Sequence, residues 1–109
     1  MKKIILFTFV LGFTACTVKL MPPTKADADF AAKKYSDCNL AQLQKGKESY
    51  EKYCNSCHGL KKPTSQTEEG WNKMVPMMSR KANKKAGSVI VDENTQNAIL
   101  RYLVVMSRK

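Results

Sequence analysis

Apolar residues recur at spacings of three and four positions in three stretches of the chain, which is the periodicity of amphipathic helices. The first stretch runs from about residue 40 to residue 57, and its inward positions are Leu43, Gly46, Tyr50, Tyr53 and Cys54. The last stretch follows Asp92, which can cap a helix, and its inward stripe is Ile99, Tyr102, Leu103 and Met106. Together with a helix between them, these stretches predict an all-α fold of about three helices.

Gly46 stands inside the first predicted helix, where a glycine costs ~1 kcal/mol relative to alanine. A close crossing of two helices explains such a position, because a residue without a Cβ lets two backbones approach. We therefore expect the first and last helices to cross there, with Gly46 and Tyr50 facing Tyr102 or Leu103.

The middle helix is expected to begin near Ser65, because Ser65 and Glu68 have the spacing of a capping box. Its apolar face carries Trp71, Met74, Val75 and Met78. Pro76 falls inside this helix, where it lacks an N–H and its ring clashes with the preceding turn. A bend or a break is therefore expected at that point.

The amino terminus has the features of an export signal. Two lysines at positions 2 and 3 precede an apolar run over residues 4–13 that is too short to span a bilayer. Residues 13–16 read Phe-Thr-Ala-Cys and resemble a bacterial lipobox, with phenylalanine in place of the usual leucine. Residues 1–15 are therefore predicted to be a lipoprotein signal peptide, and Cys16 to carry the lipid that anchors the protein in the bacterial cell envelope, facing the periplasm. The alternative is an ordinary secreted protein, or a buried Cys16 near a conventional cleavage site.

Residues 16–39 are expected to be a tether, because they contain Pro22-Pro23 and little periodic apolar content. A short helix over about residues 27–35 is expected within it. Residues 40–109 would then form the folded domain. A domain of ~70 residues builds only a marginal hydrophobic core and usually needs a staple such as a disulfide, a metal or a cofactor.

The strongest chemical signal is the pentapeptide Cys54-Asn55-Ser56-Cys57-His58, because C-x-x-C-H is the attachment signature of a c-type haem. Cys54 and Cys57 lie about one helical turn apart and can add to the two vinyl groups of one porphyrin, while His58 can bind the iron. One covalent haem c would supply the staple. A zinc site would need further ligands, which this chain supplies poorly, and no βαβ pattern supports a thiol oxidoreductase.

Met78 is the expected sixth ligand of the iron, because a thioether opposite histidine is a known axial pair in c-type cytochromes. On a helix it shares a face with Trp71 and Met74, whereas Met77 points about 100° away. Met77, Met74 and Met106 remain alternatives, as does an open or non-methionine site. The ordinary role of such methionines is to fill a core.

With these features the chain resembles a small monohaem cytochrome c of the class I type over residues 40–109. The motifs that carry the resemblance are Gly46-x-x-x-Tyr50-x-x-x-Cys54-x-x-Cys57-His58, Pro63, Trp71-x-x-Met74-Val75-x-x-Met78 and Ile99-Leu100-x-Tyr102-Leu103. The resemblance implies that a few helices wrap one covalent haem and that Pro63 helps to hold the imidazole of His58. It also implies that Met78 is the sixth ligand. Pro63 follows His58 more closely than in mitochondrial-type members, so the carbonyl that orients His58 stays open.

The chain is basic, with 19 lysines and arginines against 9 acidic residues and a net charge of +10. Eight basic residues flank the predicted haem segments: Lys45, Lys47, Lys61, Lys62, Arg80, Lys81, Lys84 and Lys85. They would steer the domain towards a redox partner with an acidic docking face, or towards anionic lipid. A solvated lysine-rich surface is the plain alternative. Nucleic acid is not an expected partner, because export separates the protein from it.

Single-electron transfer at the membrane surface is the function that these features favour. No enzymatic activity is expected, because the one histidine is assigned to iron and no paired carboxylates or activated nucleophile stand out. The alternatives are a haem-bearing subunit of a larger respiratory membrane complex and a haem-based ligand sensor with an open sixth position. Cys38 is left over, either free or paired between chains.

Overall fold

The computed structural model describes residues 19–55 and 59–109, and the regular structure within them is helical. In chain order the elements are α1 (Lys25–Lys34), α2 (Leu40–Tyr53), the short 3₁₀ helix η1 (Pro63–Ser65), α4 (Glu68–Ala86) and α5 (Glu93–Ser107). The expected all-α class is confirmed for this part of the chain. Helix α2 ends before the expected boundary near residue 57, and Cys54 is its C-cap residue.

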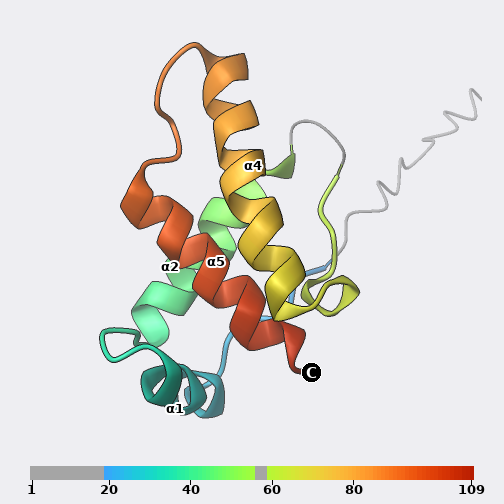
Figure 1. The fold of residues 1–109 in the computed structure, drawn as a ribbon. Helices are drawn as coiled ribbons and strands as arrows, with labels where there is room; N and C mark the ends of the chain where they lie inside the picture. Colours follow the sequence, from blue (N-terminus) through green and yellow to red (C-terminus); the bar gives the residue numbers. More distant parts are fainter. Residues whose placement is uncertain (1–18, 56–58) are drawn as a thin grey trace, which may run out of the picture.

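Helix α5 is the centre of the fold, because α1, α2, η1 and α4 all pack against it (Figure 1). It begins after Asp92, whose carboxylate accepts from the N–H of Thr95 as the expected N-cap. Its buried residues are Ala98, Ile99, Tyr102, Leu103, Val104, Val105 and Met106. Five consecutive buried positions go round the whole helix, as expected for an element covered on several sides. The stripe expected from the sequence is buried, and Val105 adds a second contact with Ala31 and Leu43.

Helices α2 and α5 cross in close contact at Gly46, as the sequence predicted. A Cβ built on Gly46 would overlap the carbonyl oxygen of Ala98 and would lie 2.8 Å from the Cβ of Tyr102. Tyr50, one turn further along α2, is buried in the same apolar cluster as Tyr102. The absence of a side chain at Gly46 therefore sets how closely these two helices approach.

The predicted start of the middle helix at Ser65 is wrong. Helix α4 begins at Glu68, and its N-cap is Thr67, whose hydroxyl accepts from the N–H of Gly70 at 3.1 Å. Ser65 lies in η1 and donates its hydroxyl to the carbonyl of Lys62. The carboxylate of Glu68 pairs with Lys34 at 2.6 Å instead of reaching back to a cap. Both halves of the expected capping box therefore bind other partners.

Helix α4 continues through Pro76 as one helix, so the proline does not break it. The missing N–H leaves the carbonyl of Asn72 without its intrahelical donor. The hydroxyl of Ser79 donates to the carbonyl of Val75 at 2.8 Å in the turn that follows. Because the turns on both sides stay helical, side chains before and after Pro76 keep the spacing of a continuous helix.

The segment expected to be a tether is folded from Leu20 onwards. Leu20 is buried in the main apolar cluster, and the hydroxyl of Tyr102 donates to the carbonyl of Met21 at 2.9 Å. The short helix expected within it is α1, which packs on α5 and α2. Small residues such as Ala31 let α1 lie close to its neighbours, and this contact produces little periodic apolar signal in the sequence.

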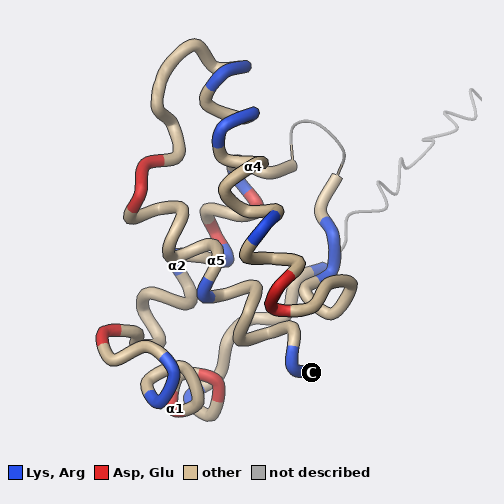
Figure 2. Tube along the Cα trace, viewed as in Figure 1, with Lys and Arg blue, Asp and Glu red and all other residues tan. Residues whose placement is uncertain are grey.

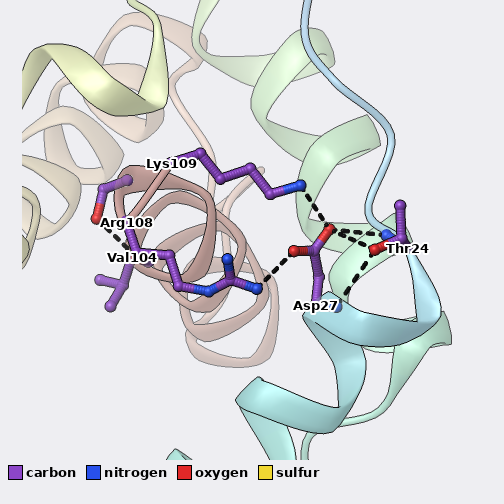
Figure 3. A network of polar contacts seen from close by, with 6 residues as sticks. Thr24, Asp27, Val104, Arg108 and Lys109 are labelled. Carbon is purple, nitrogen blue, oxygen red and sulfur yellow. Dashed lines mark hydrogen bonds and ion pairs between the residues drawn. The ribbon is translucent and has the colours of Figure 1, made fainter.

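Asp27 holds α1 to the end of α5 (Figure 3). Its carboxylate is buried, 2.7 Å from Arg108 Nη2 and 3.1 Å from Lys109 Nζ, and it also accepts from the backbone N–H of Thr24. Burial disfavours the charged carboxylate, but the hydrogen bonds from Thr24 and Lys109 outweigh it and hold the pKa of Asp27 below its usual value. The carboxylate therefore stays ionised at neutral pH and joins the two ends of the described chain.

Candidate haem-binding site

The structure describes some of the predicted site residues and leaves others outside. Cys54 and Met78 lie within it, whereas Cys57, His58 and the predicted lipidation residue Cys16 lie outside the described residues. Cys54 caps the C-terminal end of α2, and Met78 lies in the middle of α4. Both α2 and α4 pack against α5.

Cys54 is half-buried against the main apolar cluster of the protein. Burial raises the pKa of its thiol to about 11, so the thiol is uncharged at neutral pH. The reactive cysteine of a thiol oxidoreductase is instead held as a thiolate by a cationic surrounding or a helix N-terminus. Cys54 is the C-cap residue of α2, and burial is the cause of its raised pKa.

Six partly buried apolar side chains pack against the main apolar cluster. They come from α2 and its C-cap, from the chain after residue 58, from α4 and from α5, and they are Tyr53, Cys54, Leu60, Met74, Met78 and Leu100. Each packs on the buried cluster with one side and keeps the rest open to solvent. Cys54 is itself one of these side chains, so an apolar ring attached to it could cover part of this surface, and that burial would be favourable.

The methionines of α4 differ in exposure. Met77 is 41% exposed, whereas Met74 and Met78 pack against the apolar cluster that contains Trp71. This is the arrangement that a continuous helix through Pro76 predicts. Met106 is fully buried in α5. The fold therefore places the thioethers of Met74 and Met78 on the side of α4 that faces the core, and turns that of Met77 outward.

The backbone that follows His58 is held by two aromatic side chains. The hydroxyl of Tyr50 accepts from the N–H of Lys61 and donates to its carbonyl, both at 2.9 Å. Burial raises the pKa of Tyr50 to about 12, so the hydroxyl keeps the proton that it donates. The indole N–H of Trp71 donates to the carbonyl of Pro63 at 2.8 Å, and the two rings meet edge to face. The chain is thus fixed three to five residues after the predicted iron ligand.

The resemblance implies that Pro63 helps to hold the imidazole of His58. The Pro63 carbonyl accepts a hydrogen bond from the indole N–H of Trp71. The spacing of apolar residues placed Tyr50 and Trp71 on inward faces but did not predict their hydrogen bonds to the backbone. These hydrogen bonds could have been expected from the sequence, because the polar atom of a buried tyrosine or tryptophan needs a hydrogen-bond partner.

Tyr50→Phe is expected to lower the free energy of unfolding by about 1–2 kcal/mol, because it removes two hydrogen bonds to the Lys61 backbone and leaves the ring in place. Urea unfolding followed by far-UV circular dichroism measures the change. Tyr53→Phe is the matched control on the same helix, since the Tyr53 hydroxyl makes no hydrogen bond to the described residues, and we expect a change below ~0.5 kcal/mol. Equal effects of the two variants would contradict the anchoring role of Tyr50.

Other groupings give no second candidate for a metal. Within residues 19–55 and 59–109, no three side chains of His, Cys, Asp or Glu gather in a metal-binding arrangement. A pocket of about 240 Å³ lies between the N-terminal segment, η1 and the end of α5, and neither Cys54 nor Met78 lines it. Cys38 is buried apart from Cys54, with Ala31, Leu43 and Val105, and burial raises the pKa of its thiol.

Basic side chains are concentrated on the later part of α4 (Figure 2). The first turn carries Glu68 and Glu69, and the exposed basic residues that follow are Lys73, Arg80, Lys81, Lys84 and Lys85. Of the other lysines expected near the haem, Lys45, Lys61 and Lys62 are exposed, and Lys47 pairs with Glu51 at 2.6 Å. The helix that carries Met78 therefore also carries a positive surface.

Comparison of the chain with protein families, curated proteins and solved structures gives no match. No helix among the described residues is long and apolar enough to cross a membrane.

Proposed function

We propose that this protein is a single-electron carrier with one covalently bound haem c, similar to a class I cytochrome c and tethered to the membrane on the exported side. The observation that carries the proposal is the attachment sequence Cys54-Asn55-Ser56-Cys57-His58, whose first cysteine packs, partly exposed, against the main apolar cluster. Met78 also packs, partly exposed, against that cluster. The proposal thus joins an attachment motif to an apolar surface that a porphyrin would cover.

The residues have separate roles in this proposal. Cys54 and Cys57 would hold the porphyrin by thioether bonds, and His58 and Met78 would bind the iron from its two sides. The haem supplies reversible one-electron chemistry when it is bound. The partly exposed apolar side chains on the main cluster would keep water from one face of the ring, and Tyr50 would hold the backbone that follows His58.

The basic surface of α4 supports an encounter with an acidic redox partner. Arg80, Lys81 and Lys84 are exposed and lie within two turns of Met78 along the same helix. A one-electron carrier must meet its donor and its acceptor in short-lived complexes, and a field of one sign speeds such encounters at low salt. The predicted lipid on Cys16 would restrict these encounters to the membrane surface.

Expression in a host that matures c-type cytochromes should yield a protein whose mass exceeds that of the processed chain by one haem, even after acid-acetone extraction. Cys54→Ala and Cys57→Ala should each remove one of the two thioether bonds and lower the yield of haem protein severely. Cys38→Ala is the matched control, because Cys38 lies in a different apolar cluster from Cys54, and it should retain the haem. Protein of unmodified mass from a competent host would refute the proposal.

A further inference from the structure

A pocket of about 240 Å³ lies at the end of the molecule where the described chain begins and ends. Its lining combines apolar side chains with Thr64 and three lysines, and consists of Leu20, Met21, Pro63, Thr64, Met106, Lys19, Lys62 and Lys109. The lysines come from the N-terminal segment, from the loop before η1 and from the residue after α5. Lysines beside apolar side chains can bind the phosphate group of a phospholipid and contact its glyceride backbone.

Positively charged side chains outnumber negatively charged ones around this pocket. Asp27 is the carboxylate that binds the Lys109 ammonium, and it is shared with Arg108 (Figure 3). Two cations therefore face one buried anion. Lys19 and Lys62 add two further positive charges at the pocket, and both are exposed. An anion at the pocket would meet more positive than negative charge.

The pocket also lies close, along the chain, to the residue predicted to carry the lipid. Lys19 follows Cys16 by three positions, so their Cα atoms can be at most ~11 Å apart. The chain is fixed directly after Lys19, because Leu20 is buried and the Met21 carbonyl accepts from Tyr102. The side chain of Met21 is 59% exposed beside the pocket, which suits an element that meets the interfacial region of a bilayer.

We propose that this pocket binds the headgroup of an anionic phospholipid in the membrane to which the protein is anchored. Its orienting role rests on the proposed lipidation of Cys16. One acyl-bearing residue and one headgroup site then hold the same face of the domain against the bilayer. The domain is oriented by these two contacts instead of swinging on a long tether, because the segment after Lys19 is packed on α5.

Vesicle binding of the holoprotein tests the site without the lipid anchor. The protein is exported behind a conventional cleavable signal peptide with serine in place of Cys16, and is sedimented with vesicles of phosphatidylcholine alone or with one-third phosphatidylglycerol. We expect binding to the anionic vesicles only. Lys19→Gln combined with Lys62→Gln should weaken it roughly tenfold or more, since two of the cations are lost while the Asp27 network stays intact.

The matched control is Lys81→Gln combined with Lys84→Gln, which removes the same charge from the exposed later part of α4. It should weaken binding less than about threefold. Equal losses in the two double variants would overturn the site, because binding would then follow net charge alone. Equal binding to neutral and anionic vesicles, or no binding to either, would overturn it as well.

Failure of this site can be told apart from failure of the proposed function. The variant with Lys19→Gln and Lys62→Gln should keep the haem spectrum of the wild type, because it changes only two exposed side chains and leaves the hydrogen bonds of Tyr50 to Lys61 and of Trp71 to Pro63 in place. The anchor is tested separately by Cys16→Ser in the native export context. Unchanged partitioning of that variant into membranes would refute lipidation and with it the oriented anchoring, whereas the vesicle result decides the headgroup site.

Discussion

Met78→Ala is expected to lower the reduction potential of the haem-loaded protein by on the order of 200 mV, a fraction of the ~0.8 V over which axial ligands set haem potentials. The reason is that a thioether ligand favours ferrous iron and alanine supplies none. The open position should bind carbon monoxide or imidazole. The weak near-infrared band of methionine-ligated ferric haem should disappear, and the fold should largely persist because Cys54, Cys57 and His58 still hold the ring.

Met77→Ala and Met74→Ala are the controls for this assignment. Met77 is 41% exposed and turned away from the core, so its replacement should leave both the potential and the near-infrared band unchanged. Met74 packs on the same cluster as Met78, and its loss should cost packing without opening the iron. If Met78→Ala keeps the near-infrared band and Met74→Ala or Met77→Ala loses it, the methionine whose replacement removes the band is the sixth ligand. Carbon monoxide binding by the wild type would favour the sensor alternative.

Gly46→Ala is expected to lower the free energy of unfolding by about 3 kcal/mol, although alanine favours a helix by ~1 kcal/mol over glycine. The added methyl group would overlap the carbonyl oxygen of Ala98 and would lie 2.7 Å from the carbonyl carbon. These are backbone atoms of α5, so the methyl can be accommodated only if the two helices move apart. Urea unfolding of the holoprotein, followed by far-UV circular dichroism, measures the loss.

Gly70→Ala is the matched control in α4. A Cβ at Gly70 would meet the side-chain oxygen of Gln66 at 2.7 Å, and a flexible side chain can move away at little cost. This variant should be neutral or slightly stabilised. If Gly46→Ala is as stable as Gly70→Ala, helices α2 and α5 do not cross as closely as the structure describes.

Local patterns predicted the helices that carry the core. The inward stripe of α5 and the Asp92 cap could be read from spacing, because a helix covered by neighbours repeats its apolar residues with its own period. Gly46 predicted a helix crossing, because a glycine at an inward position of a helix is explained by the close approach of a second helix. The start of α4 could not be read, since Ser65 and Thr67 are both good caps and only the contacts of Ser65 with Lys62 and of Glu68 with Lys34 decide between them.

The packing of the N-terminal segment was also beyond the sequence pattern. Residues 19–39 contain few large apolar residues at helical spacing, and the pattern therefore predicted a tether. The structure attaches this segment by single contacts between residues far apart in the chain, such as Tyr102 with Met21 and Arg108 with Asp27. A buried aspartate gives no apolar signal, and two of its partners, Arg108 and Lys109, lie more than eighty positions away.

Local sequence patterns predict the all-α class and the proposed chemistry, because the attachment motif is five consecutive residues and the helical period is a local property. The packing of the helices shows which methionines of α4 face the core, since Pro76 left the course of that helix open. The packing also shows that the segment from Leu20 onwards belongs to the fold and lines a lysine-containing pocket with the end of α5. These features depend on contacts between distant residues, and no local pattern encodes such contacts.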